Sequence, residues 1–220
     1  MEQHRKQQAA EAIAAAEVAE TAAVGASLPL LLSNTAPGTM AEDAVETSAG
    51  IVKMAALSVE SLQETGGVAT VSAPETGASL TVSRQNVEQA AVAAAAAGST
   101  AEGPIVMTIM RLSQEASSKL AKDNVLARRL ASALKSQAVS VNFWTSEGVR
   151  IPLSGLNPPL SVVIEVDDPN TTCAFWDKDA AKWLDAGVTT LPGPEPNTIM
   201  CNTTHLTLFG GVVDAVLKLS

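Results

Sequence analysis

The large apolar side chains of this 220-residue chain are concentrated in its second half, so a substantial hydrophobic core has to form mainly there. Hydrophobic residues make up 46% of the sequence, but much of that share is alanine, and each alanine side chain buries little area. Aromatic residues account for only 3%. The first half is therefore expected to contribute thin, alanine-lined packing.

Short β-prone runs separated by turn residues fill the chain from Ala138 onward. The runs are Val139–Trp144, Val149–Leu153 and Leu160–Val166, and the turn signals are Glu147-Gly148, Ser154-Gly155 and Asn157-Pro158-Pro159. Strands that recur at a spacing of about 8–12 residues are typical of an antiparallel sandwich. We therefore expect a β-sandwich over residues 104–220.

The first half favours helices. A run without helix breakers predicts a helix over residues 1–24 that ends at Gly25, and a linker over 27–38 separates it from a second helix predicted by the periodic apolar residues of 41–63. Shorter predicted elements are helices over 85–97 and 124–135, strands over 68–71 and 80–82, and either a strand or a buried helix over 105–112. The expected fold class is α+β, with Ala-rich N-terminal helices and linkers over 1–103 and the antiparallel β-sandwich after them.

Charge and hydropathy exclude several classes of protein. Lys and Arg number 14 against 23 Asp and Glu, and no basic segment carries interleaved aromatic residues, so we expect no nucleic-acid partner. The densest basic stretch, 119–135, is spaced like a solvated helix face. The N-terminus lacks the apolar region of a signal peptide, and the run 28–32 is far shorter than the roughly 20 residues of a membrane span. We expect neither a signal peptide nor a transmembrane helix in this chain.

The residues from Thr172 to Val213 carry the only motif with a distinctive order. They include Cys173, Trp176, Trp183, Cys201 and the run His205-Leu206-Thr207-Leu208-Phe209. This order and spacing resemble the GPS motif that closes the GAIN domain of adhesion receptors and polycystin-type membrane proteins. That family's pattern is a Cys followed shortly by a Trp, a second Trp, Gly-Cys, and then Cys-x-Cys-x-His-Leu-Thr/Ser-x-Phe. The strands preceding the motif also look similar, so the resemblance covers about residues 130–215.

The cysteines depart from the family's pattern at two positions. Val188 follows Gly187 where the family has its second Cys, and Thr203 stands where it has its fourth. The family pairs its first Cys with its third and its second with its fourth, so the resemblance implies one disulfide, Cys173–Cys201, and the complete absence of the other. Two buried thiols are the alternative. A zinc site would need Cys173, Cys201, His205 and the remote His4 without any CxxC pair, so we expect no metal and no cofactor.

The resemblance implies self-cleavage at His205-Leu206-Thr207. The Thr207 hydroxyl can reach the Leu206 carbonyl through a five-membered ring, and His205 can accept the hydroxyl proton near neutral pH. The resulting ester is then hydrolysed. A non-cleaving structural or adhesion module with the same fold is the first alternative, and an intracellular helical protein with an accidental match is the second. No carboxylate dyad, phosphate loop or Ser/His/Asp order is present, so any catalysis is a single turnover at most.

The resemblance also implies a setting. After cleavage, the chain from Thr207 onward would remain bound as the terminal strand, and a transmembrane region of a longer parent protein would follow. The chain would lie on the extracellular face of that membrane, and the sequons at Asn170 and Asn202 are compatible with glycosylation there. Phe209-Gly210 is closer to the polycystin form than to the adhesion-receptor form.

Trp176 and Trp183 are expected to fill the core between the two sheets.

Overall fold

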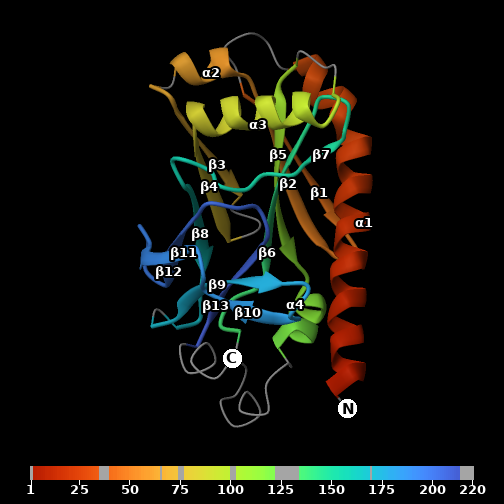
Figure 1. Ribbon diagram of the computed structural model, residues 1–220, viewed down its shortest axis with the longest axis vertical. Coiled ribbons are helices and arrows are strands. Elements are labelled where there is room, and N and C mark those ends of the chain that lie inside the picture. Colours follow the sequence, from red (N-terminus) through yellow and green to blue (C-terminus); the bar gives the residue numbers. More distant parts are fainter. Residues whose placement is uncertain are drawn as a thin grey trace.

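The computed structural model describes residues 2–34, 40–64, 66–73, 77–99, 103–121, 134–168 and 170–213. Two antiparallel sheets are stacked on each other, and a long N-terminal helix lies along the outer face of the larger sheet (Figure 1). Two shorter helices cross one end of the stack. The predicted α+β class, with helix followed by an antiparallel sandwich, is confirmed.

The larger sheet, sheet A, has eight strands, and the smaller, sheet B, has five. Sheet A runs in the order β1 (Ala41–Thr47), β2 (Gly50–Leu57), β5 (Ile105–Leu112), β6 (Val139–Trp144), β13 (Leu208–Val212), β9 (Thr172–Asp177) and β10 (Lys182–Leu184), with β7 (Arg150–Ile151) paired to β6. Sheet B runs in the order β11 (Val188–Pro192), β12 (Thr198–Thr203), β8 (Leu160–Glu165), β4 (Ala78–Ser83) and β3 (Val68–Ala73). The β-prone runs 139–144, 160–166, 68–71 and 80–82 are therefore strands, and the ambiguous 105–112 is one too.

Four helices complete the described chain: α1 (Glu2–Asn34), α2 (Val59–Glu64), α3 (Arg84–Ala96) and α4 (Gln114–Ala121). The prediction over 85–97 is confirmed by α3, which begins at a reciprocal cap because the Ser83 hydroxyl accepts from the Asn86 N–H and the Asn86 side chain accepts from the Ser83 N–H. The helix expected over 124–135 and most of the basic stretch 119–135 lie outside the described residues, apart from 119–121, 134 and 135.

One helix prediction in the first half is wrong, and another, confirmed by α1, ended its helix too early. Residues 41–57 form the hairpin β1–β2 instead of a helix, and α1 continues through Gly25 to Asn34. The hairpin forms because β2 pairs along its whole length with β5, a long-range contact that local periodicity does not register. Gly50 allows this pairing: its φ is +153°, and a Cβ there would lie 1.9 Å from the Arg111 carbonyl oxygen. In α1, burial of Leu28 and Leu31 favours helix beyond the glycine.

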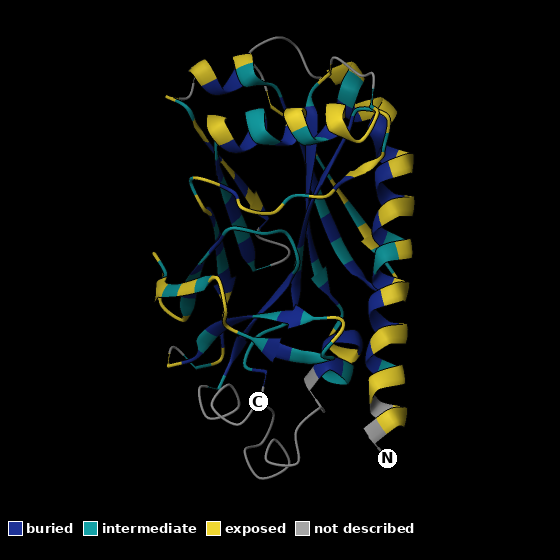
Figure 2. Ribbon diagram, in the orientation of Figure 1, coloured by how far each residue is buried: buried dark blue, intermediate teal, exposed yellow. Residues whose placement is uncertain are grey.

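Sheet A separates two hydrophobic cores. In Figure 2, buried residues run along the strands, and buried and exposed residues alternate along α1. The helix-facing cluster consists of the buried residues between α1 or α4 and sheet A, among them Ile13, Val24, Leu31, Leu120, Trp144, Trp176 and Trp183. The inter-sheet cluster lies between the two sheets and includes Ile109, Phe143, Val162, Ile164 and Phe209. Trp176 and Trp183, which stack edge to face with ring centroids 5.5 Å apart, are therefore buried on the helix side of sheet A. The expectation that they fill the space between the sheets is wrong, because β9 and β10 turn them toward the helices.

The length and composition of α1 bear on the membrane. Its segment Lys6–Asn34 is long and apolar enough to cross a bilayer by those two criteria. The sequence did not predict this, because the helix was expected to end at Gly25. A core helix meets the same criteria, and α1 places one face against sheet A. The division of the chain at residue 103 remains a prediction, and the pairing of β2 with β5 crosses it.

Candidate functional site

The segment 204–207 carries the chain from β12 in sheet B to β13 in sheet A. Backbone hydrogen bonds hold it on both sides. The Leu206 N–H donates to the Leu153 carbonyl at 3.4 Å, the Leu156 N–H donates to the Thr204 carbonyl at 2.8 Å, and the Val141 N–H donates to the Thr207 carbonyl at 3.2 Å. The His205-Leu206-Thr207 tripeptide is thus half-buried and fixed between the last two described strands, β12 and β13.

The His205 ring is held in a mainly apolar setting. Phe175 presents its ring edge-on, with centroids 4.6 Å apart, and Phe209 lies on another side at 6.3 Å. The Nδ1 atom is 3.4 Å from the Thr203 hydroxyl oxygen, whereas Nε2 is buried and has no hydrogen-bond partner among the described residues. Burial lowers the pKa of His205, so the ring is neutral at neutral pH and able to accept a proton.

The Thr207 hydroxyl points elsewhere. It donates a long hydrogen bond of 3.5 Å to the Trp176 carbonyl, and within the described residues it makes none to the His205 ring. Hydrogen bonds between catalytic groups are often long in resting proteins and shorten as the reaction proceeds. The structure therefore places the His205 ring and the Thr207 hydroxyl two residues apart in one short connection, without a hydrogen bond between them.

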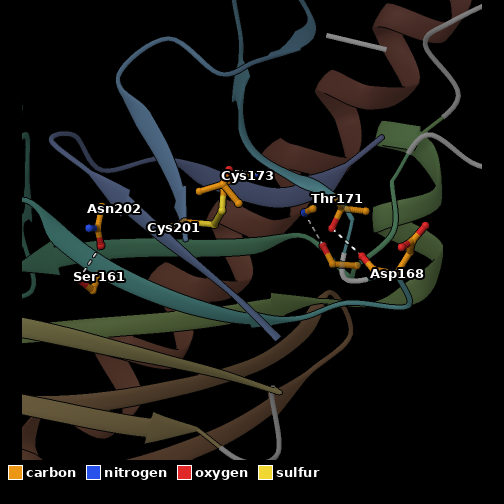
Figure 3. The surroundings of a disulfide bond; sticks show 9 residues. Ser161, Asp168, Thr171, Cys173, Cys201 and Asn202 are labelled. Atoms are coloured by element: carbon orange, nitrogen blue, oxygen red, sulfur yellow. Dashed lines mark hydrogen bonds between the residues drawn. A yellow bond between two sulfur atoms is a disulfide. The ribbon is translucent and has the colours of Figure 1, made fainter. Parts of the chain in front are cut away.

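Cys173 and Cys201 form the single disulfide (Figure 3). The bridge joins β9 of sheet A to β12 of sheet B across a sequence separation of 28 residues, with the two Cα atoms 5.6 Å apart. Both residues are fully buried, and the disulfide leaves neither as a thiolate ligand. Within the part of the chain that the structure describes, no group of three His, Cys, Asp or Glu side chains could hold a metal ion.

The two positions at which the family pattern would require a second disulfide are direct neighbours. Val188 and Thr203 are cross-strand partners in the β11–β12 pair. Thr203 is completely buried, and its hydroxyl contacts His205 three times: at the N–H, at the carbonyl and at Nδ1. A hydrogen-bonding side chain thus occupies the place of the fourth cysteine.

The strand that follows the tripeptide is central and buried. β13 lies between β6 and β9, and all five of its residues are buried. Gly210 and Gly211 permit this close packing, because a Cβ on Gly210 would lie 2.6 Å from Leu134 Cδ1 and one on Gly211 would lie 2.8 Å from Val166 Cγ1. The Gly-Gly pair therefore marks a strand enclosed on both faces.

A cavity of about 310 Å³ separates the tripeptide from α1. Glu17 of α1 lines it and forms ion pairs with Arg150, at 3.1 Å, and with Lys178. Although burial raises it, the hydrogen bonds and charges of Lys178 and Arg150 hold the pKa of Glu17 below its ordinary value. One turn further along α1, Glu20 also lines the cavity.

Glu20 is the most deeply buried charged residue of this site, with 2% of its surface exposed. Its carboxylate accepts from the Asn142 amide at 2.9 and 2.8 Å and from the Thr108 hydroxyl, which itself accepts from Trp144 Nε1 at 3.0 Å. Burial raises the pKa of Glu20, against the opposing effect of these hydrogen bonds. The network joins α1 to β5 and β6 beneath the cavity.

The sequence indicated some of these residues and not others. The spacing of Glu17 and Glu20 on one helix face could be read from the sequence, but their partners lie between 88 and 161 residues away. Phe175 lies within the motif, but the motif pattern did not indicate that its ring packs against His205. Of the two sequon residues, Asn170 is exposed, whereas Asn202 lies in β12 and its side-chain oxygen accepts from the Ser161 hydroxyl at 2.7 Å (Figure 3).

Comparison with known proteins identifies one family. The GPS family, described as GAIN subdomain B, matches residues 33–214, which include every described strand and the tripeptide. Among curated proteins the comparison finds no match. The family match extends well upstream of residue 130 and includes the hairpin β1–β2 and all of sheet B. The chain therefore belongs to the GPS family, as a GAIN subdomain B.

Proposed function

We propose that this chain is an autoproteolytic module that cleaves its own backbone between Leu206 and Thr207. The observation that carries the proposal is the position of the Leu206–Thr207 bond. Backbone hydrogen bonds hold it on both sides, directly after His205, whose neutral ring has a buried Nε2 without a partner among the described residues. The family match over residues 33–214 supports the same reading.

In the proposed reaction, the Thr207 oxygen attacks the Leu206 carbonyl carbon while His205 Nε2 takes the hydroxyl proton. The Leu206–Thr207 C–N bond then breaks as that proton passes to the leaving amine. An ester now joins Leu206 to the Thr207 oxygen. Water hydrolyses it, giving a Leu206 carboxylate and a free Thr207 hydroxyl, and the adjacent cavity of about 310 Å³ offers a route for that water.

The two products are proposed to remain associated. The fragment starting at Thr207 would keep the pairing of β13 with β6 and β9 and the burial of Phe209 and Val212. Removing it would expose this apolar surface to water. The partner of the larger fragment is thus its own C-terminal strand.

The proposed setting is the extracellular face of a membrane, as part of a longer parent protein with a transmembrane region. The disulfide agrees with an oxidising compartment. We propose the polycystin-type parent over the adhesion-receptor type because Phe209-Gly210 is closer to the polycystin form, and a Cβ on Gly210 would lie 2.6 Å from Leu134 Cδ1 and 3.0 Å from the Trp183 ring. Asn170 and Asn202 are the proposed glycosylation sites, and the exposed Asn170 is expected to carry the higher occupancy.

Intact mass after secreted expression tests cleavage. We expect two fragments, the smaller beginning at Thr207, and we expect Thr207→Ala to give only the full-length mass. Thr207→Ser is the matched control, because it keeps the hydroxyl and should still cleave. Full-length protein alone in the unsubstituted chain at neutral pH would contradict the proposal.

That outcome would favour the second candidate, a non-cleaving structural or adhesion module. One observation points to it: the Thr207 hydroxyl is bonded to the Trp176 carbonyl and not to the His205 ring. In such a module the same tripeptide would simply connect the two sheets.

A further inference from the structure

Thr203 is an exception to the pattern of its strand. Residues 199, 201 and 203 of β12 face the interior, and the first two, Ile199 and Cys201, are an apolar side chain and a disulfide cysteine. A buried hydroxyl at the third position needs hydrogen-bond partners, since an unsatisfied one costs roughly 1–3 kcal/mol. All of the described partners of the Thr203 side chain belong to His205.

The three contacts leave two ways of distributing the protons between Thr203 and His205. The Thr203 hydroxyl has a single hydrogen, and its shortest contact is to the His205 carbonyl oxygen, at 3.0 Å. If it donates there, its lone pairs remain for the His205 N–H at 3.3 Å and for Nδ1 at 3.4 Å. Nδ1 must then carry a proton in order to donate.

The opposite arrangement is worse. If the hydroxyl donated to Nδ1, the His205 carbonyl would lose its described partner, and the proton of the neutral ring would sit on Nε2. Nε2 is buried without a partner among the described residues, so this tautomer leaves a buried N–H unpaired as well. Leaving only the Nε2 lone pair without a partner costs less free energy than leaving a buried N–H and a carbonyl unpaired.

We propose that Thr203 is a positioning residue that holds His205 in the Nδ1–H tautomer and leaves Nε2 as the unprotonated, proton-accepting atom. It also ties the His205 main chain at both its N–H and its carbonyl, directly before the Leu206–Thr207 bond. The side chain thereby fastens the connection between β12 and β13 at the strand position where Val188, its cross-strand partner, offers no covalent bridge.

This inference rests on the proposed self-cleavage for its purpose, but the tautomer can be measured without it. The chain has only two histidines, so ring ¹H–¹⁵N correlation spectra are simple, and His4→Gln removes the other signal. In a Thr207→Ala background, which keeps the chain whole, we expect His205 to show a protonated Nδ1 and an unprotonated Nε2 at neutral pH.

Two variants at the position separate the hydroxyl from the fold. Thr203→Val has nearly the same shape and removes the hydroxyl, and it is expected to shift the ring toward the Nε2–H tautomer. Thr203→Ser keeps the hydroxyl and is expected to keep Nδ1–H. In the cleaving chain, pulse-chase measurement of the Thr207 fragment should show cleavage slowed at least about tenfold by Thr203→Val and little changed by Thr203→Ser.

The outcomes distinguish the two proposals. A predominant Nε2–H tautomer in the Thr207→Ala chain overturns the positioning role, even if Thr203→Val fails to fold. Unchanged tautomer and cleavage rate in a folded Thr203→Val chain overturn it as well, while cleavage itself stands. If the unsubstituted chain never cleaves but the tautomer shifts as expected in Thr203→Val, the proposed function fails and the control of His205 by Thr203 is supported.

Discussion

The two faces of sheet A are held by different means. On the inter-sheet side, large apolar residues such as Phe143 and Phe209 interlock, and a disulfide links the sheets. On the α1 side, much of the helix face is alanine, and the interface is supplemented by the buried Glu20 network and the Glu17 ion pairs. Because each alanine buries little area, we expect the inter-sheet side to dominate the free energy of unfolding. The α1 side instead borders the cavity at the tripeptide.

The largest effect is expected from the disulfide. The double substitution Cys173→Ala and Cys201→Ala should lower the free energy of unfolding by about 3–4 kcal/mol, because the bridge closes a long loop in the unfolded chain. Urea unfolding measures this, and reduction of the unsubstituted chain is the control. A loss below about 1 kcal/mol would mean that apolar packing alone holds the sheets together.

On the α1 side, Glu20→Ala is expected to cost about 2–3 kcal/mol. The substitution removes the carboxylate that accepts from the Asn142 amide and the Thr108 hydroxyl, and leaves them only the Ser140 hydroxyl at 2.9 Å and the Asn142 carbonyl at 3.3 Å as acceptors. Val18→Ala is the matched control on the same helix, because Val18 is 71% exposed and should be nearly neutral. Equal effects of the two variants in urea unfolding would show that α1 is not docked through Glu20.

The pH dependence of stability sharpens this prediction. Burial raises the pKa of Glu20 in the folded chain, so its contribution to stability is complete below the ordinary carboxyl pKa and is lost as pH rises through the raised value. Glu20→Gln cannot ionise, and its amide can donate to Asn142 Oδ1, which has no partner among the described residues. The Gln variant should therefore gain stability relative to the unsubstituted chain as pH rises. A difference that is constant with pH would contradict the raised pKa.

The two sides of sheet A also help to explain which features of the structure the sequence predicted and which it did not. The family resemblance implied the Cys173–Cys201 disulfide that is present and a strand directly after Thr207, which is β13. The sequence did not predict the β1–β2 hairpin, since pairing of β2 with β5 overrides local periodicity. Nor did it show that Trp176 and Trp183 lie on the helix side of sheet A, or that Glu20 meets Asn142 across 122 residues. Those facts depend on which face of a strand meets which layer.

Substitution of the two adjacent glycines of β13 tests the packing on each face of sheet A separately. A Cβ on Gly211 would meet Val166 Cγ1, a stiff β-branched group on the inter-sheet side, whereas one on Gly210 would meet Leu134 Cδ1, the movable end of a longer side chain on the helix side. Within the usual overpacking range of about 1–3 kcal/mol, Gly211→Ala is expected to be the more destabilising. Thermal unfolding of the two variants compares them, and the reverse order would indicate that the helix-facing cluster is the less compliant side.

The smallest effect is expected from the ion pairs at the rim of the cavity. Glu17, Arg150 and Lys178 keep 39–54% of their side-chain surface exposed, so solvent screens their attraction. Glu17→Gln should lower the free energy of unfolding by no more than about 1 kcal/mol. Its lowered pKa means that this contribution is present at neutral pH and is lost as pH falls through the carboxyl range. A double-mutant cycle with Lys178→Gln at low and high salt measures the coupling. A coupling that high salt leaves unchanged would show that these charges are shielded from solvent, and that the α1 side is held more tightly than its alanine face implies.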